Sequence, residues 1–178
     1  TVVGGAPLAG VDEESLRIEY RPLPTQPTVP DVVGVHCLVS GLLWGLVDAG
    51  HPILELPWAD ARDCFYDVVR EGLDADLAWV DAAGERTDDP DVVFGEVFEY
   101  ARRGLRARGL GTAEVDDYLD PVERRWTERT TPSRWKIRTV RAHLDAGADL
   151  RTAVEAMQRE YRERSRAGDP LVEWPTRW

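Results

Sequence analysis

The sequence predicts an α+β fold, in which a mostly helical bundle packs on one or a few antiparallel strands. Apolar and charged residues alternate strictly only in residues 16–21, whereas residues 30–166 carry mainly helical spacing. With 178 residues and 43% hydrophobic content, the chain is long enough to bury a real core. We therefore expect a single domain over residues 1–178.

The first part of the chain predicts one strand. Residues 1–14 mix Gly, Ala, Pro and acids without periodicity, which predicts a loop or a frayed end. Residues 16–22 then form the expected strand, with an apolar face and a charged face made by Arg17, Glu19 and Arg21. A lone strand leaves backbone groups unpaired, so it needs partners. The candidates are the first residues and Leu77–Val80, and we expect a larger sheet that is mostly missing.

Helices are expected from Pro30 onward, since a proline is tolerated at the first position of a helix. Asp89 and Thr131, each followed by proline, are start signals, and Gly72 is a stop signal. A short hairpin is expected around Ala83-Gly84. The expected helices span residues 30–49, 58–71, 90–108, 113–128, 132–146 and 149–166.

Charge bears on the class of partner. A formal net charge of -11 argues against nucleic acid, which is bound through clustered Lys and Arg. Among the 22 basic residues only Lys136 is a lysine, which leaves 21 arginines (22 minus 1) against 33 acids. This composition favours a halophilic source, in which salt screens the acidic surface, although genomic base composition could also explain the arginines.

No membrane segment is expected, because the longest apolar run, residues 32–47, is short and interrupted by Gly, His and Ser. Cys37 and Cys64 sit in apolar helical patterns and are interpreted as buried, reduced thiols. A cytoplasmic location follows, although one bridge between them stays open. The only methionine is Met157, so we expect that Thr1 is not the encoded first residue.

The candidate chemistry lies on the charged face of the strand. Glu19 and Arg21 are two residues apart and share that face. A carboxylate suits Mg²⁺, and a guanidinium can hold a phosphate or carboxylate oxygen. The simpler alternative is a solvated face whose ion pairs contribute little.

The strand Leu16–Pro22, the turn Gln26-Pro27-Thr28 and the apolar helix ending near Leu46 resemble a late motif of carboxylate-amine ligases, above all glutamate-cysteine ligases. In that family an apolar-Glu-apolar-Arg strand precedes a Gln-Pro-Thr turn and a long helix. More distantly, the segment is similar to glutamine synthetases. The resemblance implies a glutamine synthetase-like sheet in the full-length protein.

The resemblance continues over most of residues 16–166. Residues 70–77 are similar to the family's Tyr-Gly-Leu-Asp-Ala segment, with Glu71 where the family has an aromatic residue. Residues 130–136 stand where the family has a Gly-rich turn that carries Gln or Arg, and residues 147–154 resemble the start of its last helix.

The resemblance implies an enzyme that uses ATP and Mg²⁺ and acts on glutamate and cysteine or another amine. It implies that Glu19 is a metal ligand and that Arg21 contacts the transferred phosphate. In the family most other ligands lie earlier in the chain, so we expect this chain to be an inactive C-terminal portion. The alternative is a noncatalytic acidic helical module that binds proteins. Self-association through the edge of the strand is also expected.

The remaining candidates have ordinary interpretations beside functional ones. His36 is interpreted as a core or interface histidine, and no His or Cys spacing indicates zinc. Arg134 and Lys136 near a helix start could bind phosphate or could simply be solvated. Trp126 and Trp135 are expected to pack the bundle, and the tail, residues 167–178 with Trp174, to dock on a partner.

Overall fold

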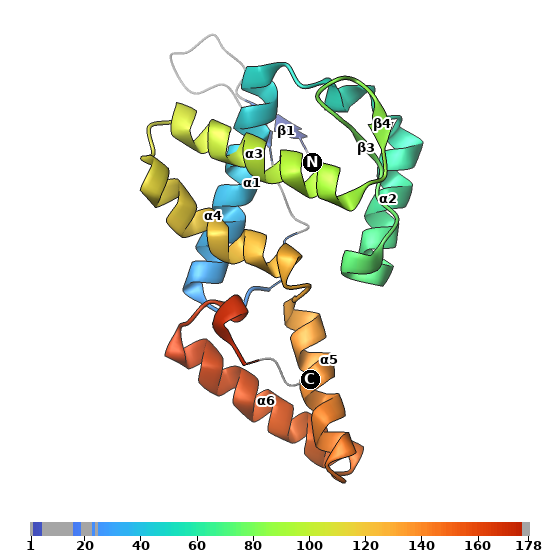
Figure 1. Cartoon of the computed structure of the whole chain (residues 1–178), viewed down its shortest axis with the longest axis vertical. Coiled ribbons are helices and arrows are strands. Elements are labelled where there is room, and N and C mark those ends of the chain that lie inside the picture. Colours follow the sequence, from blue (N-terminus) through green and yellow to red (C-terminus); the bar gives the residue numbers. More distant parts are fainter. Residues whose placement is uncertain (1, 5–15, 19–22, 24, 176–178) are drawn as a thin grey trace.

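The structure is a computed structural model that describes residues 2–4, 16–18, 23 and 25–175. Two helical bodies are stacked end to end along the long axis (Figure 1). The first body contains α1 (Val29–Ala49), α3 (Pro90–Ala107) and α4 (Thr112–Thr127), and the second is a hairpin of α5 (Pro132–Asp145) and α6 (Leu150–Ala167). The mostly helical α+β class is confirmed.

The other helical elements are short or peripheral. They are η1 (Pro52–Glu55), α2 (Trp58–Glu71), η2 (Gly72–Asp74) and η3 (Leu171–Glu173). All six expected helices are confirmed, with ends that differ from the expected ones by at most one residue.

Local capping chemistry explains this agreement. The Asp89 carboxylate accepts a hydrogen bond from the Asp91 N–H at 2.9 Å, and the Thr131 hydroxyl accepts one from the Arg134 N–H at 3.2 Å. Each cap satisfies a backbone donor that has no partner inside its helix. Gly72 ends α2 with φ +62°, a conformation that glycine adopts without steric cost. The start and stop signals are therefore confirmed.

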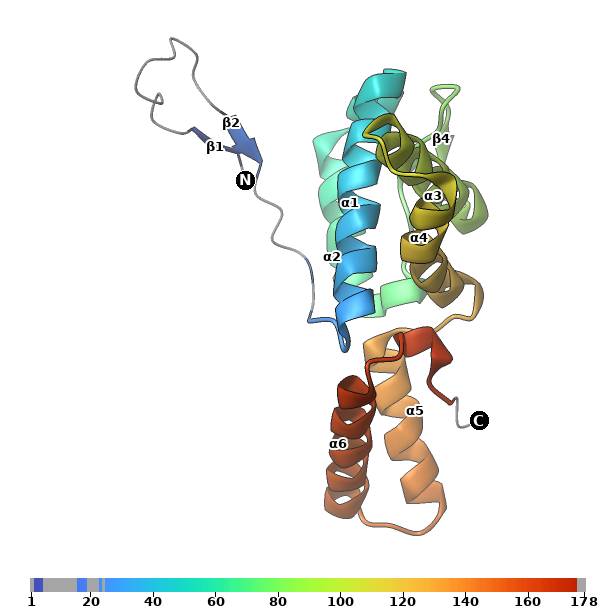
Figure 2. The same cartoon turned by 90° about the vertical axis from the view of Figure 1, so that its left-hand side faces the viewer.

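Two small antiparallel sheets accompany the helices. Strand β1 (Val2–Gly4) pairs with β2 (Leu16–Ile18), and β3 (Trp79–Val80) pairs with β4 (Arg86–Thr87). The expectation of a loop or frayed end over residues 1–14 is wrong at residues 2–4, because these residues supply the partner that the strand needed. The hairpin around Ala83-Gly84 is confirmed. Figure 2 shows β1 and β2 to one side of the helices.

Glycines set the packing of the first body. A Cβ atom on Gly41 of α1 would lie 2.5 Å from the Ala101 carbonyl oxygen of α3, and one on Gly104 of α3 would collide with the α1 backbone at Gly41. Gly45 meets Tyr100 in the same way. The backbones of α1 and α3 therefore touch directly, as only small residues permit. Beside this crossing lies a core cluster of Ala101, Leu105, Val115 and Leu119.

The second body has its own aromatic core. Trp135 of α5, Met157 of α6 and Leu171 and Trp174 of the final segment form one buried cluster. The rings of Trp135 and Trp174 are 5.1 Å apart and meet edge to face, a preferred geometry for aromatic pairs. Trp135 packs the bundle as expected. The expectation that Trp174 docks on a partner is wrong, because its side chain is 4% exposed and packs within its own chain.

The helix α1 is longer than the apolar run read from the sequence. Its length and composition alone would allow it to cross a membrane, as they would for many core helices of water-soluble proteins. The argument from a short run is therefore wrong, while the absence of a membrane segment stays a prediction. Much of α1 and α2 exposes apolar side chains, among them Val29, Trp44, Val47, Trp58, Phe65, Tyr66 and Val69.

The glycine crossing can be tested within α3. We expect Gly104→Ala to lower the free energy of unfolding by about 1–3 kcal/mol or more, because the added methyl group would force two backbones apart. The matched control is Gly95→Ala, since nothing lies within 4 Å of that position. The control should be neutral or stabilise by about 0.5–1 kcal/mol. Equal effects in denaturant titrations would contradict the crossing.

Candidate functional site

The two predicted site residues, Glu19 and Arg21, lie outside the described residues. What the structure describes is the turn after them, Gln26-Pro27-Thr28, at the start of α1 and at the junction of the two helical bodies (Figure 2). Its surroundings therefore define the nearest site that can be built from atoms.

Asp31 is the centre of this junction. It lies in the first turn of α1 and is 1% exposed. The Thr28 hydroxyl donates to its carboxylate at 2.7 Å, and the same hydroxyl accepts from the Asp31 N–H at 3.4 Å. A carboxylate at a helix N-terminus is also favoured by the helix dipole. Residue types and local spacing thus fold the turn onto its own helix.

Arg125 of α4 completes the charge pairing. Its Nη2 donates to Asp31, and its Nη1 donates to the side-chain oxygen of Gln26 at 2.7 Å. Both partners of the ion pair are nearly inaccessible to water. A buried charge is costly unless it is paired and hydrogen-bonded, so each partner requires the other. One guanidinium therefore fixes Gln26 and the start of α1 together.

The second helical body is attached at the same carboxylate. The Leu171 N–H of η3 lies 3.2 Å from each of the two Asp31 oxygens and donates to both. Nearby, burial in the first place and the negative charge of Asp31 in the second raise the pKa of the Tyr161 hydroxyl on α6. Asp31 thus joins α1, α4 and η3, and the polar junction separates the two apolar cores.

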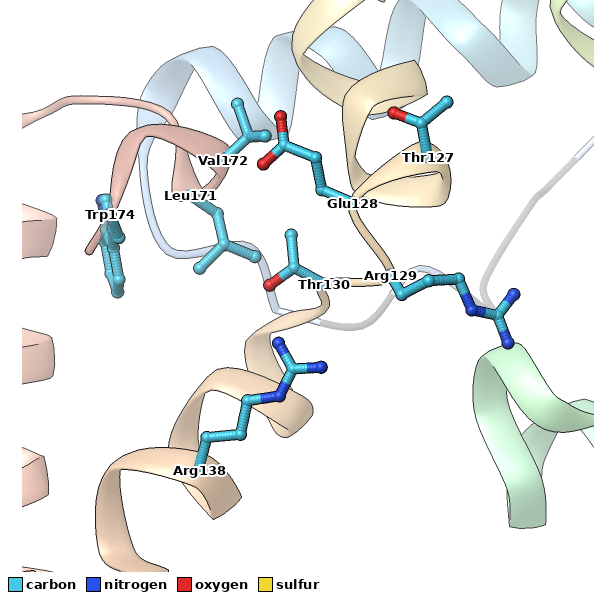
Figure 3. Close-up of a pocket in the computed structure, with 8 residues that line it drawn as sticks. All are labelled: Thr127, Glu128, Arg129, Thr130, Arg138, Leu171, Val172 and Trp174. Atoms are coloured by element: carbon cyan, nitrogen blue, oxygen red, sulfur yellow. The ribbon is translucent and has the colours of Figure 1, made fainter. Parts of the chain in front are cut away.

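A cavity of about 400 Å³ opens beside this junction (Figure 3). Its walls come from the link between α4 and α5, from one turn of α5 and from η3. The lining residues are Thr127, Glu128, Arg129, Thr130, Arg138, Leu171, Val172 and Trp174. Leu171 belongs to both the cavity and the junction, so the turn 26–28 and the cavity are held in a fixed relation.

A group of arginines lies on the other side of the linker. Arg134 and Arg129 both pair with Asp74 of η2, and these hydrogen bonds, that of Arg134 first, lower the pKa of the Asp74 carboxyl. Arg129 also donates to the Leu73 carbonyl at 2.6 Å and has φ +49°. Arg134 is therefore engaged within the chain rather than simply solvated. Lys136 lies 4.2 Å from the centre of the Tyr161 ring.

A polar cluster around His51 was missed by sequence reasoning, which placed this residue only in a turn. The Ile53 N–H donates to His51 Nδ1 at 3.1 Å, so Nε2 carries the proton and donates to Glu96 at 3.2 Å. The Trp79 ring N–H donates to the same carboxylate at 2.7 Å. Because both ring nitrogens are occupied, His51 ties α3 to the β3–β4 hairpin rather than offering a general base.

Other histidine and cysteine expectations have mixed outcomes. His36 is exposed and its Nδ1 lies 3.0 Å from the Val32 carbonyl oxygen, so the core interpretation is wrong. Cys37 and Cys64 are unpaired and half-buried, and burial raises the pKa of the Cys37 thiol. In the described part of the chain no group of three or more His, Cys, Asp or Glu side chains could hold a metal ion. These residues therefore offer no metal centre of their own.

The chain matches no known protein family, no curated protein and no solved structure. Function must therefore be argued from the junction, the cavity and the motif that precedes them.

The junction makes a quantitative prediction. We expect Asp31→Asn to lower the free energy of unfolding by about 3–5 kcal/mol, because it leaves Arg125 buried without its counter-charge. The control is Asp63→Asn, which removes an exposed ion pair with Arg62 and should cost less than about 1 kcal/mol. Both values come from denaturant titration. A small effect at Asp31, similar to that of the control, would show that the junction does not hold the two bodies together.

Proposed function

We propose that this chain is the C-terminal portion of an ATP-dependent carboxylate-amine ligase of the glutamate-cysteine ligase kind. The observation that carries the proposal is the anchoring of Gln26 and Thr28 by Arg125 and Asp31. A strand that presents catalytic charges needs a rigid exit, because small displacements of reacting groups are costly in rate. The resemblance had singled out this turn, and its anchoring gives the turn a physical role.

In the proposed reaction the γ-phosphoryl group of ATP passes to the γ-carboxylate of glutamate, which yields an acyl phosphate and ADP. An amine, that of cysteine or a related compound, then attacks the acyl carbon and displaces phosphate. Mg²⁺ would offset negative charge during the transfer. In this proposal Glu19 supplies an oxygen ligand to the metal, and Arg21 holds the transferred phosphate.

The surface of α1 and α2 supports the idea of an incomplete protein. Trp58 and Leu54 are 79% and 94% exposed, and α1 adds further apolar side chains. Exposed apolar surface of this extent is typical of an interface. The two-stranded sheet β1–β2 also has edges without partners in the described residues. We propose that the rest of a glutamine synthetase-like sheet continues from β1–β2 and that the rest of the ligase covers α1 and α2.

A second candidate is a noncatalytic acidic module that binds other proteins. It is favoured by α2, where the exposed Phe65 and Tyr66 stand among acidic residues such as Asp63 and Asp67. In this candidate the apolar face binds a separate partner instead of the rest of a ligase. The buried position of Trp174 removes the tail as its contact site. For both candidates we propose a cytoplasmic, salt-adapted protein without a nucleic-acid partner.

Calorimetric titration with Mg-ATP tests the ligase proposal. We compare this chain with a version that is extended toward the N-terminus, each at low salt and in molar KCl, because salt should screen repulsion among the 33 acidic residues. The extended protein should bind Mg-ATP in molar KCl, and the chain alone should not. Binding by neither version would overturn the ligase proposal and favour the module.

Single substitutions in the extended protein sharpen this test. Glu19→Gln and Arg21→Gln should each reduce glutamate-dependent ADP formation by about 100-fold or more, as expected when a group that stabilises the transition state is removed. The control Glu155→Gln changes an exposed carboxylate on α6 and should leave the rate unchanged. Equal rates in all three variants would contradict the assigned roles.

A further inference from the structure

The cavity beside the junction is large enough for a small molecule. At about 400 Å³ it falls within the size range of ligand pockets. Three segments that are separate in sequence supply its walls, and Asp31 ties one of them, η3, to the first body. The space is therefore a fixed feature of the fold and does not depend on one loop.

One end of the cavity is cationic. Arg138 projects from α5 toward Thr130, as Figure 3 shows, and its Nη1 atom is buried. A guanidinium keeps its charge under all ordinary conditions, and its attraction for an anion grows as water is excluded. The surrounding hairpin of residues 132–167 carries nine basic and five acidic residues, a net charge of +4 (9 minus 5) in a chain of net charge -11. An anion would therefore be attracted to this end.

Thr130 supplies an independent observation. Its side chain is 8% exposed and lines the cavity, yet none of the described residues forms a hydrogen bond with its hydroxyl. Its backbone is satisfied, since the Thr130 N–H donates to the Arg125 carbonyl at 2.9 Å. Buried polar groups normally have partners, and one without a partner is destabilising. A hydroxyl that faces a cavity in this state is suited to bind a ligand.

The other charged groups of the cavity are already engaged. Figure 3 shows the Glu128 carboxylate on the side of Val172, away from Arg138, and Glu128 pairs with Arg124 at 2.9 Å. The Arg129 guanidinium points out toward η2, where it contacts Leu73 and Asp74. The inner end therefore presents one cation and one hydroxyl without a competing carboxylate.

The opposite wall is apolar. Leu171, Val172 and Trp174 line it from η3 and the residue after it, and all three are buried. Such a wall contributes affinity for a hydrocarbon group, while a few polar atoms fix its orientation. The chemistry of the two ends thus specifies a ligand with one anionic end and one apolar end.

We propose that this cavity binds the carboxylate group of a small molecule through Arg138 and Thr130, while the apolar part of the molecule packs on Leu171 and Trp174. The inference is independent of the ligase proposal, because it rests on no residue of the β1–β2 segment. A free phosphate shares the anionic chemistry but lacks the apolar group. It should therefore bind the same end more weakly than a carboxylate with a hydrocarbon side chain.

The probes are N-acetyl-leucine, its uncharged amide and inorganic phosphate, titrated into the full chain and followed by NMR shifts of the Thr130 and Leu171 amides. We expect N-acetyl-leucine to bind, the amide to bind at least tenfold more weakly, and phosphate to compete with N-acetyl-leucine. Binding of the amide as tight as that of the acid would overturn the proposal, as would the absence of shifts with every probe. Shifts with phosphate alone would also overturn it.

Substitutions assign the contacts. Thr130→Val should weaken binding about five- to tenfold, in line with the loss of one hydrogen bond, while the unfolding temperature without ligand stays equal or rises. Arg138→Gln should abolish binding of N-acetyl-leucine, whereas Arg141→Gln, an exposed arginine of the same helix, should leave it unchanged. Should Arg138→Gln fail to fold, Thr130→Val decides alone. Wild-type affinity in Thr130→Val would overturn the assignment.

Discussion

The pairing of Asp31 with Arg125 is the constraint on which the rest of the structure depends. Both side chains are buried, so the pair is stable only while both charges and their hydrogen bonds remain in place. The same carboxylate accepts from the Leu171 N–H, which belongs to the second helical body. Two apolar cores of modest size are therefore coupled through one polar centre, and neither end of the molecule can move without disturbing it.

The glycine crossing transmits this constraint through the first body. Because the backbones of α1 and α3 touch at Gly41 and Gly104, α1 cannot rotate or slide without a steric clash. Asp31 therefore occupies a fixed point at one end of a rigid helix. The turn before that helix and the cavity beside η3 inherit fixed positions, as binding and catalytic groups require. By contrast, the exposed apolar face of α2 is suited to contact a further partner.

The parts of the fold that the sequence predicted well depend on neighbours in the chain. Caps such as Thr131 and stops such as Gly72 act within one helical turn, so their signals are local. The parts that it missed depend on distant partners. Asp31 meets Leu171 across 140 residues, Trp174 is buried by helices that precede it, and Thr130 gains interest only because a cavity forms around it. Glu19 and Arg21 stay predictions, since they lie outside the described residues.

Native-state hydrogen exchange at the Leu171 amide tests the central role of Asp31 most directly. If this N–H is held by the buried carboxylate, its exchange should require global unfolding, with a free energy equal to that of core amides such as Ala101. Exchange through a low-energy local opening, as at a frayed chain end, would contradict the account. It would show that η3 detaches while α1 and α4 stay folded.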